Sequence, residues 1–110
     1  MISENAIQAE IYQWYNNTFC LASHNPQCII FSVPNGGTRN IREALLLKAT
    51  GVVAGVSDLI IVRQNEIIFV EVKTETGKQS KEQKNFQQKA HKLGFKYILV
   101  RSLEDFKKQI

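Results

Sequence analysis

Hydrophobic residues along the chain recur in two patterns, one typical of helices and one of strands. In residues 3–19, large side chains recur at Ile7, Ile11 and Trp14, and Ser3 can cap the start, so this segment is predicted to be a helix. Short apolar runs rich in β-branched residues predict strands over 28–33, 58–62, 66 or 67 to 73, and 96–100. Further helices are expected over about 39–50, 80–93 and 102–109. Phe86, Ala90 and Leu93 are predicted to point inward from the third helix.

The order of these elements predicts the fold class. The residues Arg63–Asn65 suit the turn of a β-hairpin. The helix over 80–93 connects two strands and implies a right-handed crossover between parallel neighbours. We therefore expect an α/β fold, with a mixed β-sheet flanked by helices in a single domain over residues 1–110.

The composition of the chain indicates the cellular compartment in which the protein is expected. No apolar run reaches the ~18 residues that span a bilayer, and residues 1–10 carry acids and no basic start, so neither a membrane anchor nor a secretory signal is expected. The two cysteines, Cys20 and Cys28, make a poor disulfide framework, and reduced thiols in a cytoplasmic protein are expected instead. A zinc site from Cys20, His24 and Cys28 is an alternative, although the segment lacks the paired spacing of zinc motifs.

The net charge of +4 is unevenly spread. Residues 73–92 carry six lysines against two acids, whereas residues 1–50 carry three of each sign. A local basic excess attracts phosphate through counterion release. A solvated lysine-rich helix face would produce the same pattern, so charge alone does not predict nucleic-acid binding.

Three charged residues stand beside strong strand signals. Glu71 and Lys73 lie two apart in one strand, so their side chains point to the same face. Asp58 begins the preceding strand, and a hairpin would bring it close to Glu71. Two carboxylates, with the Val72 carbonyl as a third ligand, suit Mg²⁺ or Mn²⁺, and Lys73 could orient a water or stabilise phosphorane charge.

The bare pattern of Asp followed by Glu-X-Lys is weak, because the solvent face of an edge strand would show it too. Its context strengthens it, since each acid adjoins a long apolar run where Glu is rare unless paired or ligating. Glu10 lies beside the apolar stripe of the first helix and either turns to solvent or reaches into the same site.

Two further segments have a structural and a functional reading. Ser80-Lys81-Glu82-Gln83 is a capping box, while Lys78 and Lys81 could contact phosphate near the helix start. The turn Pro34-Asn35-Gly36-Gly37 ends a strand, and its backbone, with Arg39, could instead bind phosphate.

Together these residues resemble the virus-type replication-repair nucleases, the VRR-NUC branch of the PD-(D/E)XK superfamily. The resemblance covers nearly the whole chain. It rests on Glu10, the segments 34–37 and 48–51, Arg39, Gly55-Val56-Ser57-Asp58-Leu59, Glu71-Val72-Lys73 and Lys78-Gln79-Ser80 leading to Gln83. Family members commonly have Pro at the position of Ser57, a departure confined to the loop before Asp58.

The resemblance implies a restriction-endonuclease-like core and an active site formed by Glu10, Asp58, Glu71 and Lys73, with Gln83 as an accessory residue. Glu10 is expected to join Asp58, Glu71 and Val72 as a metal ligand. It also implies a Mg²⁺- or Mn²⁺-dependent DNA endonuclease that acts on branched or junction DNA as a homodimer. Small stand-alone members look like phage or bacterial proteins. The alternatives are a sequence-specific restriction-type nuclease, for which 110 residues leave little base-reading material, a non-catalytic nucleic-acid-binding module, and an interaction domain without nucleic acid.

Overall fold

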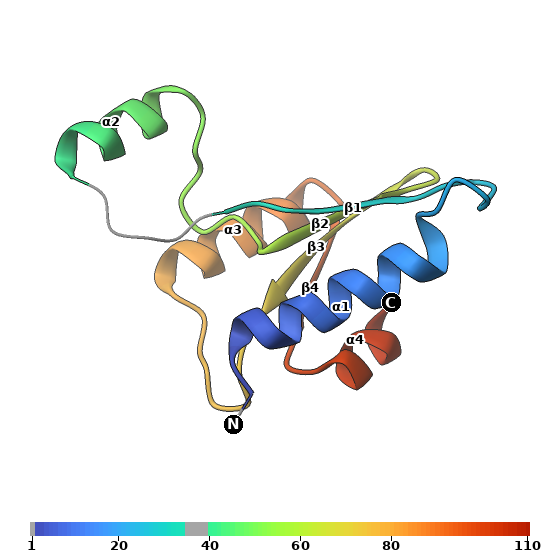
Figure 1. The fold of residues 1–110 in the computed structure, drawn as a ribbon. Coiled ribbons are helices and arrows are strands. Elements are labelled where there is room, and N and C mark those ends of the chain that lie inside the picture. Colours follow the sequence, from blue (N-terminus) through green and yellow to red (C-terminus); the bar gives the residue numbers. More distant parts are fainter. Residues whose placement is uncertain (1, 35–39) are drawn as a thin grey trace.

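The computed structural model describes residues 2–34 and 40–110, and the predicted elements follow one another in the predicted order. Its four-stranded sheet has the order β1-β2-β3-β4 (Figure 1), formed by Ile29–Ser32, Leu59–Arg63, Glu66–Val72 and Lys96–Val100. The first three strands pair antiparallel, and β4 pairs parallel to β3. The mixed sheet expected from the sequence is therefore confirmed.

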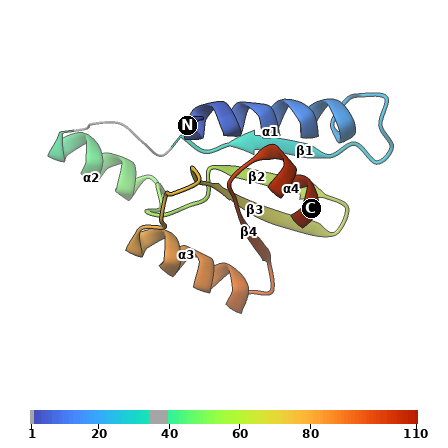
Figure 2. The same ribbon diagram turned by 90° about the horizontal axis from the view of Figure 1, so that it is seen from below.

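One face of the sheet carries the hydrophobic core. Helix α1 (Glu4–Phe19) buries Ile7, Ile11 and Tyr15 against it, and α4 (Leu103–Gln109) places the Phe106 ring 6.0 Å from that of Tyr15. Figure 2 shows α1 and α3 on opposite sides of the sheet. Alternate strand residues complete the core, as the two-residue period of a strand requires: Ile30, Leu59, Ile61, Ile68, Val70, Val72, Ile98 and Val100.

The opposite face is covered by α3 (Lys81–Lys92) over β3 and β4. The Phe86 ring packs edge-on against Phe69, with the centroids 5.1 Å apart. Because side chains alternate along a strand, Glu71 and Tyr97 also point to this face. Leu93 was predicted to point inward and is exposed instead, because α3 ends at Lys92 and Leu93 is only its C-cap.

Helix α2 (Ile41–Ala49) stands away from the sheet (Figure 1), and none of its residues is buried. Each helix begins where the sequence offers a side-chain cap. Ser3, Asn40, Ser80 and Ser102 each accept a hydrogen bond from a backbone N–H in the first turn. Within the described residues, every helix is too short or too polar to cross a bilayer.

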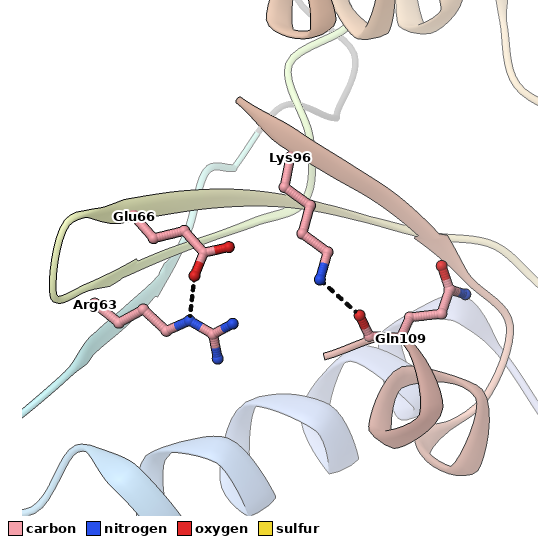
Figure 3. A network of polar contacts seen from close by, with 4 residues as sticks. All are labelled: Arg63, Glu66, Lys96 and Gln109. Carbon is pink, nitrogen blue, oxygen red and sulfur yellow. Dashed lines mark hydrogen bonds and ion pairs between the residues drawn. The ribbon is translucent and has the colours of Figure 1, made fainter. Parts of the chain in front are cut away.

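Two polar contacts fasten the far end of the sheet (Figure 3). Arg63 Nε donates to Glu66 Oε2 at 2.9 Å across the turn between β2 and β3, and Lys96 Nζ donates to the Gln109 carbonyl at 2.9 Å. Each contributes at most about 1 kcal/mol, because the groups are partly exposed. The Arg63–Glu66 contact supports the hairpin register, since these residues are also paired across the strands, and that register places the site at the other end. The Lys96–Gln109 contact ties α4 to β4.

Candidate active site

The start of β2 and the end of β3 meet at one end of the sheet. The antiparallel register sets Leu59 against Val70, so Asp58, one residue before β2, lies opposite Glu71. Asp58 Oδ2 accepts a hydrogen bond from the Val72 backbone N–H at 2.7 Å. The Val72 carbonyl faces the same way, because the N–H and C=O of one strand residue point to the same side. The fold thus brings Asp58, Glu71 and the Val72 backbone together.

Glu71 is almost completely buried, with 1% of its surface exposed. Its Oε2 accepts a hydrogen bond from Gln83 Nε2 at 3.3 Å, and its Oε1 accepts one from the Tyr97 hydroxyl at 3.4 Å. The Tyr97 oxygen in turn accepts from Gln79 Nε2 at 3.2 Å. Side chains from β4, from α3 and from the segment before α3 therefore fix the orientation of the carboxyl group.

The electrostatics of Glu71 depart from those of an exposed acid. Burial first, and then the neighbouring Asp58 carboxylate, raise the pKa of Glu71 to about 9. The Lys73 ammonium acts in the opposite direction without offsetting them. A divalent cation bound between the two carboxylates would remove this imbalance, because it neutralises both. The local chemistry therefore fits a hard metal ion.

The donor set limits how a cation would be held. Within the described residues, no group of three or more His, Cys, Asp and Glu side chains gathers to hold a metal. Asp58 and Glu71 supply carboxylate oxygens, and the Val72 carbonyl would add a main-chain oxygen. Oxygen ligands of this kind suit Mg²⁺ or Mn²⁺, which retain water at their remaining positions.

Lys73 extends the pairing of β3 by one residue, because its N–H donates to the Val100 carbonyl at 3.0 Å. The alternation of the strand puts its side chain on the face that carries Glu71. The residue is only 9% exposed. Its ammonium lies near enough to Glu71 to lower the pKa of that carboxyl group, as expected for a charged group within the same site.

Gln83 takes part in the capping box and also contacts Glu71. Its Oε1 accepts from the Ser80 N–H at 2.8 Å and completes the capping box of α3. Its Nε2 donates to Glu71. The first turn of the helix therefore also carries a side chain of the site, and one residue serves both purposes because its amide has separate donor and acceptor ends.

A polar cavity of about 390 Å³ opens beside Asp58. It lies where the end of β1, the start of β2, α1 and α3 converge. Its lining consists of Asn5, Gln8, Ser32, Val33, Pro34, Val56, Asp58 and Gln83. Space for a polar ligand therefore adjoins Asp58 and Gln83.

Glu10 lies elsewhere. It is exposed on α1 and lines a separate cavity of about 440 Å³ with Glu75 and Arg101. Arg101 Nη1 donates to the carbonyls of Thr74 and Gly77, at 2.6 and 2.7 Å, and so holds the loop that follows Lys73. The fold places Glu10 near this loop and not in the cavity that adjoins Asp58.

The structure describes only some of the residues that were predicted to contact phosphate. Lys78 and Lys81 are exposed on either side of the α3 N-cap, close to Gln83 in the chain. Asn35, Gly36 and Arg39 lie outside the described residues.

The zinc alternative receives no support from the described part of the chain, where no metal-binding group of Cys, His and acidic side chains is found. Cys20 is buried and Cys28 is half-buried, and both are free thiols. His24 Nδ1 accepts a hydrogen bond from the Leu21 N–H at 2.9 Å, which gives this nitrogen a local structural partner.

The geometry agrees with what the comparisons with known proteins show. The family model described as the VRR-NUC domain matches residues 2–104. The chain belongs to the VRR-NUC family. A solved structure titled "VRR_NUC domain protein" has the same fold, with a TM-score of 0.77 at 20% identity, over 99% of this chain and 85% of that chain. No curated protein matches the chain.

Membership in the VRR-NUC family makes this chain a nuclease-type domain, for which DNA is the implied substrate. Its mixed sheet flanked by helices is consistent with the restriction-endonuclease-like core expected for such a domain.

Two further residues, Tyr97 and Gln79, belong to the hydrogen-bond network around Glu71 but were not predicted from the sequence to lie in the site. Tyr97 stands in the apolar strand that was recognised only as structural. A buried tyrosine usually needs a partner for its hydroxyl, and that requirement is a signal in the sequence. The partner itself follows from the parallel register of β3 and β4, which sets Phe69 beside Tyr97 two residues before Glu71.

Proposed function

We propose that this VRR-NUC domain is a Mg²⁺- or Mn²⁺-dependent DNA endonuclease that hydrolyses phosphodiester bonds in branched DNA. The proposal rests on one observation above all, the approach of Asp58 to the buried Glu71 beside the Val72 backbone. A buried glutamate with a raised pKa beside a second carboxylate is costly for stability and is typical of cation-binding and catalytic sites.

Each residue has a separate task in this proposal. Asp58, Glu71 and the Val72 carbonyl would hold the cation, which when bound polarises the scissile phosphate and lowers the pKa of an attacking water. Lys73 would place its ammonium against the charge that develops on the phosphate, or orient the water. Gln83 and Tyr97 keep Glu71 in its orientation through their hydrogen bonds.

The DNA path would run over the first turn of α3. Lys78 and Lys81 are exposed there, and backbone N–H groups at a helix start favour anions. Asn35, Gly36 and Arg39 extend the predicted path from the resemblance alone. Glu10 likewise keeps the active-site role that the resemblance implies as a prediction.

We propose further that the protein acts as a homodimer in the cytoplasm of a bacterial or phage-infected cell. One active site cuts one strand, so paired cuts across a DNA junction need two sites in fixed geometry, which a two-fold dimer supplies.

The decisive experiment is cleavage of labelled four-way junction, flap, single-stranded and duplex DNA with Mg²⁺, with Mn²⁺ or with chelator. The wild type should cut with either metal, and Lys73→Ala should not. Lys92→Ala, at the far end of α3, is the matched control and should cut normally. Glu10→Gln in the same assay tests the role implied by the resemblance.

Wild-type protein that binds DNA but never cuts with either metal would remove the catalytic proposal and leave a nucleic-acid-binding module. Equal cutting of all substrates would remove the selectivity for branched DNA. Cleavage confined to one duplex sequence would point to the restriction-type alternative.

A further inference from the structure

Helix α2 has the composition of a core helix but packs against no core within the described residues. Six of its nine residues are Ile, Leu or Ala, and they are distributed around the helix. Such a helix is normally buried, and nine residues are too few for a stable isolated helix in water. None of its residues is buried, however, and Leu45 is 62% exposed.

The sheet, in turn, has an apolar area that lacks a covering helix among the described residues. On the face that α3 covers over β3 and β4, the half formed by β1 and β2 is left open by the described residues. Phe31 is 42% exposed and Ile29 is 55% exposed. These residues alternate with the buried Ile30, so they point away from the core. The register forms two apolar rows here, Ile29–Val62–Ile67 and Phe31–Ile60–Phe69.

An uncovered helix and an uncovered sheet face thus occur in the same chain. Helix α2 does not cover this face itself, since both views place it away from the sheet (Figures 1 and 2). We propose that α2 of one copy packs on the open β1–β2 face of a second copy, and the reverse, to form a two-fold homodimer. This inference names the interface of the homodimer proposed above and rests on that proposal.

The occupant is a second copy because exchange satisfies both surfaces in one symmetric step. In a two-fold interface each contact occurs twice. The helix of each chain therefore covers the open half-face of the other chain, and neither surface stays exposed. Burial of apolar side chains is the main favourable term in such an association.

The same arrangement would place the two active sites close to the interface. Phe31 lies in one row with Ile60 and Phe69, and Glu71 follows Phe69 by two residues, so the open face and Glu71 are on the same side of the sheet. The segment that follows α2 returns to the sheet at Val56, which lines the cavity beside Asp58. A partner helix on this face would therefore lie beside the site and fix the distance between the two sites of the dimer.

Sedimentation velocity at micromolar concentration tests the surface without DNA or metal. The wild type should be a dimer, whereas Leu45→Glu and Phe31→Glu should each be monomers with unchanged circular dichroism. Leu93→Glu is the matched control, because this leucine is 74% exposed at the C-cap of α3, outside the proposed surface, and it should leave the dimer intact.

Cross-linking identifies the contact directly. In a Cys20→Ser, Cys28→Ser background, a copy with Leu45→Cys is mixed with a copy with Phe31→Cys and treated with a short bismaleimide. A covalent dimer of the two different copies is expected, and Leu93→Cys in place of Leu45→Cys should give none. A chain carrying both Leu45→Cys and Phe31→Cys should link to a second chain and not within itself.

Three results would overturn the interface: a monomeric wild type, a dimer that survives Leu45→Glu, or a link formed only within one chain. None of them concerns cleavage. A monomer that still cuts DNA leaves the nuclease proposal in place, and a cross-linked dimer that never cuts leaves the interface in place.

Discussion

At the scale of single residues, the site depends on how the Glu71 carboxylate is held. Glutamate is rarely buried unless it is paired or binds a cation. Here it accepts hydrogen bonds from Gln83 and from Tyr97. Burial raises the pKa of Tyr97 above its usual range, so the hydroxyl stays protonated at neutral pH and remains a donor. The carboxyl group is therefore oriented before a cation binds.

Removal of the Tyr97 hydroxyl should weaken metal binding more than catalysis. Tyr97→Phe should raise the Mn²⁺ concentration needed for half-maximal cleavage by about tenfold, because residues that orient a metal ligand contribute on that order to affinity. The rate at saturating Mn²⁺ should change little.

Direct Mn²⁺ titration by electron paramagnetic resonance checks this change without DNA. Tyr12→Phe removes the hydroxyl of a partly exposed tyrosine on α1 and is the matched control. Unchanged Mn²⁺ affinity in Tyr97→Phe would show that the hydroxyl does not position Glu71.

The metal-free protein should lose stability as pH rises. Glu71 has a pKa of about 9 in the folded protein against an ordinary 4.5, so folding takes up a proton between these values. Because the native state then binds more protons than the unfolded state, the free energy of unfolding falls across this interval. Urea denaturation in chelator at pH 5.5, 7 and 8.5 should show the decline.

In Glu71→Gln, which cannot ionise, the decline between those pH values should be smaller. The same dependence on pH in the variant and the wild type would show that another group is responsible.

At the scale of elements, the loop before Asp58 is pressed against the first turn of α3. Gly55 has φ +81°, and a Cβ atom there would lie 2.2 Å from the Glu82 carbonyl oxygen. This contact sets the start of β2 beside the turn that presents Gln83. The pairing of loop and helix is what brings Asp58 and Gln83 to one cavity.

Gly55→Ala should therefore disturb both stability and the site. The alanine would have to adopt a left-handed backbone conformation, and its Cβ atom would overlap the Glu82 backbone. Together these effects should lower the free energy of unfolding, measured by urea denaturation, by at least about 2 kcal/mol. Gly94→Ala is the matched control, since its φ is +85° with nothing within 4 Å, and it should lose only about 1 kcal/mol. Equal losses would show that the close approach has no energetic consequence.

At the scale of the whole molecule, basic side chains gather on one element. Lys78 and Lys81 flank the start of α3, on the side of the sheet that carries Glu71. Phosphate contacts fix the position of DNA and make binding depend on salt, without reading sequence. This arrangement suits an enzyme that recognises DNA shape.

Lys78→Ala and Lys81→Ala should each weaken binding to all DNA substrates alike. Each should also reduce the slope of log affinity against log salt by about 0.9 for duplex DNA, since one phosphate contact is lost. Fluorescence anisotropy over a salt series measures both. Lys108→Ala, on α4 at the opposite face of the sheet, is the control and should leave the slope unchanged. An unchanged slope in Lys78→Ala and Lys81→Ala would show that DNA binds elsewhere.

The sequence by itself determined the elements and the character of the site. Helix caps and hydrophobic periods are local signals, so every helix and strand lies within about two residues of its expected range, in line with the usual uncertainty at element ends. The pattern Asp58, Glu71, Lys73 also lay within one hairpin. A hairpin has a fixed register, so the meeting of these residues follows from local rules.

Only the tertiary structure decided which distant residues share the site. Tyr97 reaches Glu71 through the parallel pairing of β3 with β4, whereas Glu10 lines a separate cavity together with Arg101. Likewise, the apolar sequence of α2 predicted a helix but not its exposure. Periodicity along a chain specifies which residues share a face, whereas the packing of remote segments specifies what that face meets.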